Sequence, residues 1–121
     1  MTKPNTVINI INIPVEYNKR DDVSIFSLIE ESGYFNAHDQ ITYDDIRAAI
    51  VEYPESVNAW LQYSEDKRSS DGWYFKPADQ GYEVGFFGQK MIDRKHQIYS
   101  NRLEACAVFI KNEIEAIRQG R

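Results

Sequence analysis

The sequence predicts an α+β domain of about four helices packed with a small antiparallel β-hairpin or sheet. Apolar residues recur at helical spacing in several stretches, and two aromatic-rich runs of strand type flank a short loop. The length of 121 residues is that of one domain. No repeat, low-complexity tract or linker interrupts the chain, so residues 1–121 are expected to form a single domain.

The N-terminal segment, residues 6–13, is rich in β-branched and apolar residues with spaced asparagines. Such a segment can form a strand that ends at Pro14. It can equally form the opening turns of a helix. The sequence leaves both alternatives open.

Residues 22–32 predict the first secure helix. Three apolar residues would share one face at i, i+3 and i+4: Ile25, Leu28 and Ile29. Asp21 or Asp22 is the expected N-cap, and Gly33 supplies the C-terminal stop.

A second helix is predicted to begin at Thr42, because Asp45 follows three residues later as in a capping box. The apolar residues of this helix recur at i, i+3, i+4 and i+7 and form one stripe: Ile46, Ala49, Ile50 and Tyr53. Pro54 should end this helix and occupy the first position of the next, residues 55–66. The third helix should bury Val57, Trp60 and Leu61. A connection this short predicts a corner or an antiparallel pair.

The strand candidates are Trp73–Lys76 and Tyr82–Phe87, which flank the loop Pro77–Gly81 and follow a turn at Ser69–Gly72. The C-terminal helix is predicted over Asn101–Gln119. Its apolar stripe has spacings of three and four residues: Leu103, Cys106, Ile110, Ile114 and Ile117.

Acidic residues are concentrated in one stretch. Residues 21–66 contain eleven Asp or Glu and one basic residue, Arg47, so this stretch carries a formal net charge of −10. Such a field repels nucleic acid and anionic membranes and attracts basic surfaces. Twelve of the sixteen aromatic residues lie between Tyr34 and Phe87. A stretch that combines acidic residues with Tyr and Trp predicts a protein that binds a basic protein partner.

The expected binding residues lie on the solvent-exposed sides of the second and third predicted helices. The carboxylates that would pair with Lys or Arg of the partner are Asp44, Asp45, Glu52, Glu55 and Glu65. Tyr43 and Tyr63 lie off the apolar stripes and are the expected aromatic anchors. Tyr74 is a further tyrosine that the pattern allows to be exposed.

The sequence contains no catalytic motif, so we do not expect an enzyme. His38-Asp39 lacks the further histidines of a metal-dependent phosphohydrolase, and Cys106 falls on a helical apolar face where thiols are inert. Cysteine and histidine are too few for a structural zinc site, so no metal or cofactor is expected.

Two alternatives remain open. One is a small enzyme or ligand-binding domain with an aromatic pocket, lined by Trp60, Trp73, Tyr74 and Tyr82. The other is a homodimer in which the acidic stretch pairs with one basic cluster: Lys90, Arg94, Lys95, His96 and Arg102. The low pI, near 5.0, argues against nucleic acid as the partner of that cluster.

The composition also indicates the cellular compartment of the protein. A single cysteine fits a reducing environment. The sequence shows no signal-peptide layout and no window approaching the roughly 18 apolar residues of a membrane span. A soluble cytoplasmic protein is expected.

Three short segments resemble a family of small uncharacterised bacterial domains: Ser32–Phe35, Gly72–Phe75 and Glu104–Ile114. That family has no established activity, so the resemblance implies no catalytic residue. By size, acidity and aromatic content the chain also resembles, in general type, immunity proteins that neutralise secreted bacterial toxins. This second resemblance implies an inhibitor that occludes the active or nucleic-acid-binding site of a basic toxin, such as a nuclease.

Overall fold

The computed structural model describes residues 2–67, 72–87 and 95–120. In this part of the chain the helices are α1 (Lys3–Ile11), α2 (Ile13–Lys19), α3 (Ile25–Ser32), α4 (Tyr34–Ala37), α5 (Tyr43–Glu52), α6 (Ser56–Asp66) and α7 (Arg102–Arg118). The strands are β1 (Gly72–Ala78), β2 (Gly81–Phe87) and β3 (Lys95–Tyr99). The α+β class is confirmed, but about four helices was an undercount, since the described residues form seven.

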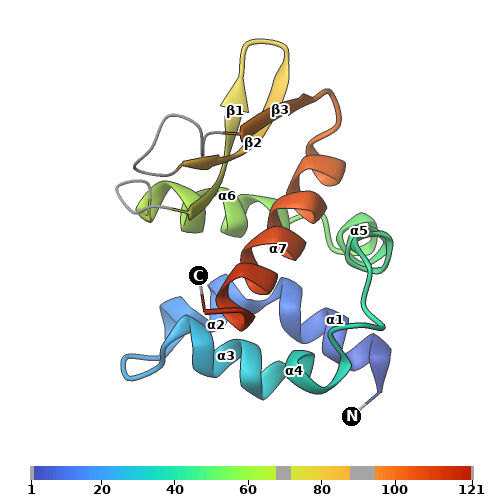
Figure 1. The fold of residues 1–121 in the computed structure, drawn as a ribbon, viewed down its shortest axis with the longest axis vertical. Helices are drawn as coiled ribbons and strands as arrows, with labels where there is room; N and C mark the ends of the chain where they lie inside the picture. The colour runs from blue at the N-terminus through green and yellow to red at the C-terminus, as the bar shows by residue number, and fades with distance from the viewer. Residues whose placement is uncertain (1, 68–71, 88–94, 121) are drawn as a thin grey trace.

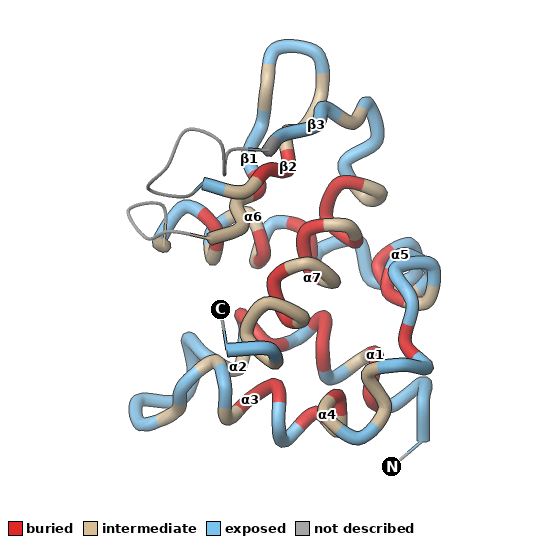
Figure 2. The backbone as a smooth tube through the Cα atoms, in the orientation of Figure 1, coloured by how far each residue is buried: buried red, intermediate tan, exposed pale blue. Residues whose placement is uncertain are grey.

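Helix α7 runs through the middle of the molecule, with the sheet at one end and α1 to α4 at the other (Figure 1). Buried residues recur along most of its length (Figure 2). Phe109 of α7 stacks on Phe75 of β1 at 5.7 Å between ring centroids and meets Trp60 of α6 edge-on at 6.0 Å. Asn101 caps the helix by accepting hydrogen bonds from the amides of Leu103 and Glu104. The predicted C-terminal helix is therefore confirmed, and it organises the core.

Residues 6–13 are helical, so the strand alternative is wrong. Val7, Ile10 and Ile11 recur at i, i+3 and i+4, and burying them together requires a helix. Helix α1 ends at Asn12, and Pro14 then lies in the first turn of α2, where its missing N–H leaves no hydrogen bond unmade.

The helix predicted over residues 22–32 begins later than expected. Ser24 is the N-cap rather than Asp21 or Asp22, because its Oγ accepts from the Ser27 amide at 3.0 Å. Gly33 ends the helix with φ of 93°, as predicted. The short helix α4 follows directly and was not predicted. It buries the side chain of Tyr34 completely.

The capping box of α5 is confirmed. The Asp45 amide donates to Thr42 Oγ1 at 3.2 Å, and the Thr42 amide donates to Asp45 Oδ2 at 2.9 Å. Pro54 lies in the turn before α6, which begins at Ser56, so its predicted place at the first helical position is wrong. Figure 1 shows α5 nearly end-on and α6 lengthwise, so the two helices form the corner that was one of the two predicted arrangements.

The sheet is antiparallel in the order β1-β2-β3. The predicted hairpin is confirmed, but its turn is tighter than expected, because Pro77 lies within β1, paired with Tyr82. Proline is tolerated there because β1 is an edge strand. Strand β3 was not predicted; its first two residues, Lys95 and His96, were assigned to the basic cluster. Residues 69–71 of the turn predicted at Ser69–Gly72 lie outside the described residues, and Gly72 begins β1. No described helix is long and apolar enough to cross a membrane.

Candidate protein-binding site

The outward side of α5 combines carboxylates with exposed apolar side chains. Ile46 and Ile50 are fully buried on the inner side. Asp44, Ala48 and Val51 follow the opposite side at i, i+4 and i+7 and are exposed. We define the α5 face by these exposed residues on the helix and just beyond it: Tyr43, Asp44, Arg47, Ala48, Val51, Glu52 and Glu55.

The apolar part of the α5 face is unusually accessible. Val51 is 57% exposed and Tyr43 is 42% exposed. Tyr53, the C-cap of α5, is 38% exposed, although it was predicted to lie on the buried stripe. Exposed apolar groups on one helix, bordered by charge, are typical of a contact surface for another protein.

The carboxylates of the α5 face are not paired within the fold, although Asp44 lies in the first turn of α5, where the helix dipole favours a negative charge. Within the described residues, no ion pair or side-chain hydrogen bond involves Asp44, Glu52 or Glu55. Glu52 is the last residue of α5, and the last turn contains no basic residue. A carboxylate at that end opposes the helix dipole and destabilises the helix slightly. Arg47, also exposed on α5, only partly offsets the negative charge.

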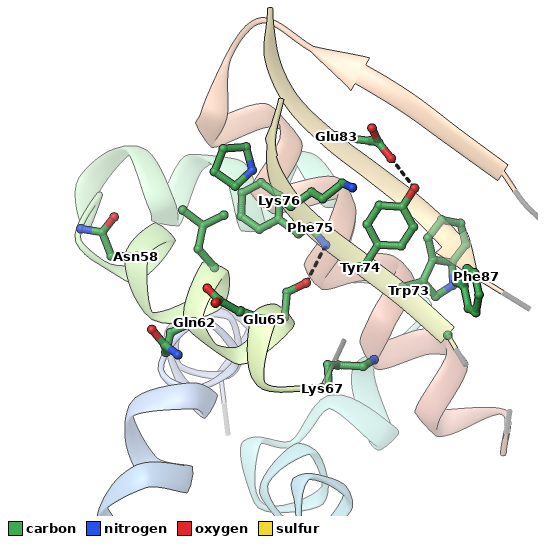
Figure 3. Close-up of a pocket in the computed structure, with 14 residues that line it drawn as sticks. Asn58, Gln62, Glu65, Lys67, Trp73, Tyr74, Phe75, Lys76, Glu83 and Phe87 are labelled. Carbon is green, nitrogen blue, oxygen red and sulfur yellow. Dashed lines mark hydrogen bonds between the residues drawn. The ribbon is translucent and has the colours of Figure 1, made fainter. Parts of the chain in front are cut away.

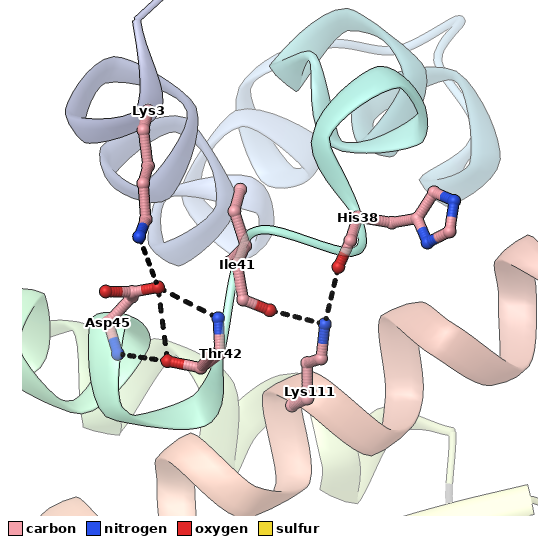
Figure 4. Close-up of polar contacts among 6 residues, drawn as sticks. All are labelled: Lys3, His38, Ile41, Thr42, Asp45 and Lys111. Atoms are coloured by element: carbon pink, nitrogen blue, oxygen red, sulfur yellow. Dashed lines mark hydrogen bonds and ion pairs between the residues drawn. The ribbon is translucent and has the colours of Figure 1, made fainter.

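Asp45 belongs to the fold rather than to the binding surface. Its carboxylate completes the Thr42 capping box and lies 3.1 Å from Lys3 Nζ (Figure 4). Partial burial tends to raise the pKa of Asp45, but the amide and hydroxyl of Thr42 and the ammonium of Lys3 together lower it. A carboxylate engaged in this way is a poor candidate for a partner's lysine or arginine.

Tyr63 is not an exposed anchor. Its ring packs edge-on against Trp60 at 5.2 Å between centroids, and its hydroxyl donates to Glu113 Oε2 at 2.6 Å. Burial first, and then the negative charge of Glu113, raise the pKa of the Tyr63 hydroxyl. The same Glu113 oxygen accepts from Lys67 Nζ at 2.6 Å, so Tyr63 belongs to a buried polar cluster.

Glu65 lies apart from the α5 face, on α6. It lines a groove between α6 and β1 with a cavity volume of about 620 Å³ (Figure 3). Trp73 and Tyr74 of the predicted aromatic pocket line this groove as well. Trp60 and Tyr82 do not. Trp60 is buried and donates from Nε1 to the Ile11 carbonyl at 3.1 Å, and Tyr82 packs on Phe75.

The predicted basic cluster is described only in part. His96 and Arg102 are exposed, and Lys95 begins β3. Lys90 and Arg94 lie outside the described residues, so the pairing of this cluster with the acidic stretch stays a prediction.

The ring of His38 packs edge-on near Tyr34, at 6.4 Å between ring centroids, and its backbone carbonyl accepts a hydrogen bond. Lys111 Nζ donates to the carbonyls of His38 at 3.1 Å and Ile41 at 2.6 Å and to Tyr34 Oη at 2.8 Å. This lysine ties the loop before α5 to α7 (Figure 4), and burial lowers its pKa. In the described part of the chain, no group of three or more His, Cys, Asp or Glu could hold a metal ion. Cys106 is buried, which raises the pKa of its thiol.

No protein-family model matches the chain, and the searches of curated proteins and of solved structures found no match either. The resemblances noted in the sequence therefore stay predictions. The functional interpretation depends on the geometry of the α5 face.

Proposed function

We propose that this chain is a non-enzymatic binding domain whose α5 face covers a basic surface of a protein partner, in the manner of an immunity protein that blocks a toxin. One observation carries the proposal: Asp44, Glu52 and Glu55 are exposed on the α5 face with Val51, and no ion pair or side-chain hydrogen bond within the described residues engages them. A nuclease toxin is the kind of partner that fits, since its phosphate-binding lysines and arginines would meet these carboxylates.

The proposed mechanism is occlusion. Asp44 and Glu52 lie eight residues apart on α5, which is about 12 Å along a helix, so they can engage two separate basic side chains. Val51 lies between them and can exclude water from the contact, which strengthens each ion pair. The excess acid of residues 21–66 would draw the partner in, and added salt would weaken this attraction.

Asp45 and Tyr63 are excluded from the proposed site because their polar groups make hydrogen bonds and ion pairs within the fold. Glu65 remains acidic and exposed but belongs to the groove beside β1. Val51 takes the place of Tyr63 as the apolar anchor beside Tyr43. The proposal assigns the protein to the cytoplasm, where Cys106, the one cysteine of the sequence, would stay reduced.

The test compares two triple variants with the same change in net charge. Asp44→Asn, Glu52→Gln and Glu55→Gln neutralise the α5 face. Asp21→Asn, Asp22→Asn and Glu30→Gln form the matched control, since these carboxylates are also exposed. Wild type is first used as bait at about 50 mM and about 500 mM salt in a lysate of the source cell, to find a basic partner whose binding salt weakens.

The association rate of the purified partner is then measured with each variant. We expect the α5 variant to slow association about tenfold at low salt and the control to change it little. If both variants slow association equally, the net charge of the protein, rather than the position of the carboxylates, determines the association rate. An unchanged rate with the α5 variant would place the contact elsewhere.

A further inference from the structure

Lys111, near the middle of α7, holds the segment that leads into the α5 face. Its ammonium donates to three oxygen atoms: Tyr34 Oη at 2.8 Å, the His38 carbonyl at 3.1 Å and the Ile41 carbonyl at 2.6 Å. An ammonium has three N–H donors and no acceptor. These three bonds therefore use the full hydrogen-bonding capacity of the side chain.

The surroundings of this ammonium strengthen the three bonds. Tyr34 is fully buried, and Lys111 Nζ lies over its ring, 4.9 Å from the centroid. Burial first, and then the nearby carboxylate of Glu115, raise the pKa of the Tyr34 hydroxyl, so it stays neutral and its oxygen accepts from Lys111. Hydrogen bonds from a charged donor in partly buried surroundings are stronger than those between neutral groups in water.

The segment that Lys111 binds connects α4 to α5. It consists of residues 38–41, and Lys111 binds the first and the last of its carbonyls. The last carbonyl belongs to Ile41, which directly precedes Thr42, the N-cap of α5. The Ile41 side chain is also buried, so its carbonyl and its side chain are both anchored. The ammonium of Lys111 thus fixes the point from which α5 starts.

A second lysine reaches the start of α5 but holds it less firmly. Figure 4 shows Lys3 of α1 and Lys111 of α7 approaching it from different elements. Lys3 Nζ lies 3.1 Å from the Asp45 carboxylate, and these two side chains are 47% and 28% exposed. An ion pair this accessible to water contributes little. Lys111 is therefore the stronger of the two anchors.

The first two residues of α5, Tyr43 and Asp44, belong to the α5 face. A contact surface binds more tightly when its side chains are already held in place, since ordering them on contact costs free energy. We infer that Lys111 is a positioning residue of the α5 face, which holds the first turn of α5 so that Tyr43 and Asp44 are presented to the partner. The inference rests on the proposed function for the existence of that partner.

The first test uses the free protein and needs no partner. Hydrogen exchange of the Asp45 and Ile46 amides, which donate to the N-cap, reports on the first turn of α5, and the Tyr53 amide reports on the other end. We expect Lys111→Met to speed exchange at the first turn about tenfold relative to the other end. Lys3→Met, the same chemical change at the weaker anchor, should do so less than about threefold. Unchanged exchange in Lys111→Met would overturn the inference.

The second test measures the affinity of the purified partner for each variant. Removal of a positive charge should by itself tighten binding to a basic partner, so a weaker complex reports lost positioning rather than lost charge. We expect Lys111→Met to weaken the complex about fivefold or more, because the binding-competent arrangement of the first turn is populated less.

The control for a general loss of stability is Val84→Ala, which removes buried methyl groups from β2. This variant should change the affinity less than about twofold, because the sheet does not form the α5 face. Circular dichroism checks that each variant folds. If Lys111→Met does not fold, Lys111→Gln, which keeps two N–H donors without the charge, is measured instead and should change exchange and affinity in the same directions.

The outcomes separate the inference from the proposed function. If Lys111→Met speeds exchange but binds the partner as tightly as wild type or more tightly, Lys111 does not position the α5 face, and the inference is overturned while the proposed function stands. If Lys111→Met weakens the complex but the α5 triple variant associates at the wild-type rate, the first turn of α5 makes the contact without its carboxylates. The inference then stands and the proposed function fails.

Discussion

Helices α7 and α5 both carry carboxylates; all of those on α7 serve the fold, whereas Glu52 of α5 does not. Glu104 lies in the first turn of α7, where the helix dipole favours a negative charge. Glu113 binds Lys67, and Glu115 binds Arg118 in the last turn at 2.6 Å. Every acidic residue of α7 thus has a structural role.

The carboxylates of α5 follow a different pattern. Asp45 is engaged in the capping box, but Glu52 lies at the unfavourable end of the helix with no basic residue in the last turn. Helix α3 also has no basic residue in its last turn, but its Glu31 is paired with Arg20 at 3.1 Å. A residue that the fold would be better without is a candidate for function, since activity is commonly retained at some cost in stability.

The largest effect that would sharpen this comparison is expected at Glu113. Its side chain is 4% exposed, and Glu113→Ala would leave Lys67 Nζ and the Tyr63 hydroxyl without their acceptor. We expect the free energy of unfolding to fall by about 3 kcal/mol, measured by urea denaturation. The double variant Glu113→Leu with Lys67→Met should recover most of the loss. A loss below about 1 kcal/mol would show that this carboxylate is not structural.

A smaller effect, dependent on pH, is expected at Asp45. Because its pKa is lowered in the folded protein, the folded state binds a proton less readily than the unfolded chain. The stabilisation is therefore complete above about pH 4 and is lost as the pH falls through the lowered pKa. Asp45→Asn should cost about 1 kcal/mol at neutral pH, and its difference from wild type should shrink on acidification. A difference that stays constant to about pH 2 would contradict the assigned ion pair and cap.

Local signals were sufficient to predict several elements. The apolar spacing of α5, α6 and α7, the Thr42–Asp45 capping box and the Gly33 stop all act within a few residues. Strand β3 has no such signal, because its residues, Lys95–Tyr99, are mostly polar and exposed and become a strand by pairing with β2. The composition of α1 is compatible with a strand or a helix. The helix forms because its apolar face is buried against α3 and α5.

The candidate site was predicted less well for a related reason. Tyr63 lies off the main stripe of α6, which suggested exposure, but α6 is covered by both the sheet and α7, so its second side is also occupied. Tyr53 lies on the stripe of α5, but the helix ends there and its side chain is partly released to solvent. Periodicity gives the faces of a helix, whereas the number of neighbours that cover them is a tertiary property.

The smallest expected effect is the most direct test of the comparison between the two helices. Glu52→Gln removes a charge that opposes the dipole of α5, so the free energy of unfolding should rise by a few tenths of a kcal/mol. Glu104→Gln, the same chemical change in the first turn of α7, should lower it by a similar amount. Paired thermal melts at low salt measure both differences.

Binding to the partner should separate the two variants in the opposite sense. Glu52→Gln should slow association, because Glu52 belongs to the α5 face, while Glu104→Gln should leave the rate unchanged. A carboxylate whose removal stabilises the protein and weakens binding has no structural reason to be there. If Glu52→Gln instead destabilises the protein, Glu52 has a role in the fold, and the contrast with α7 no longer points to function.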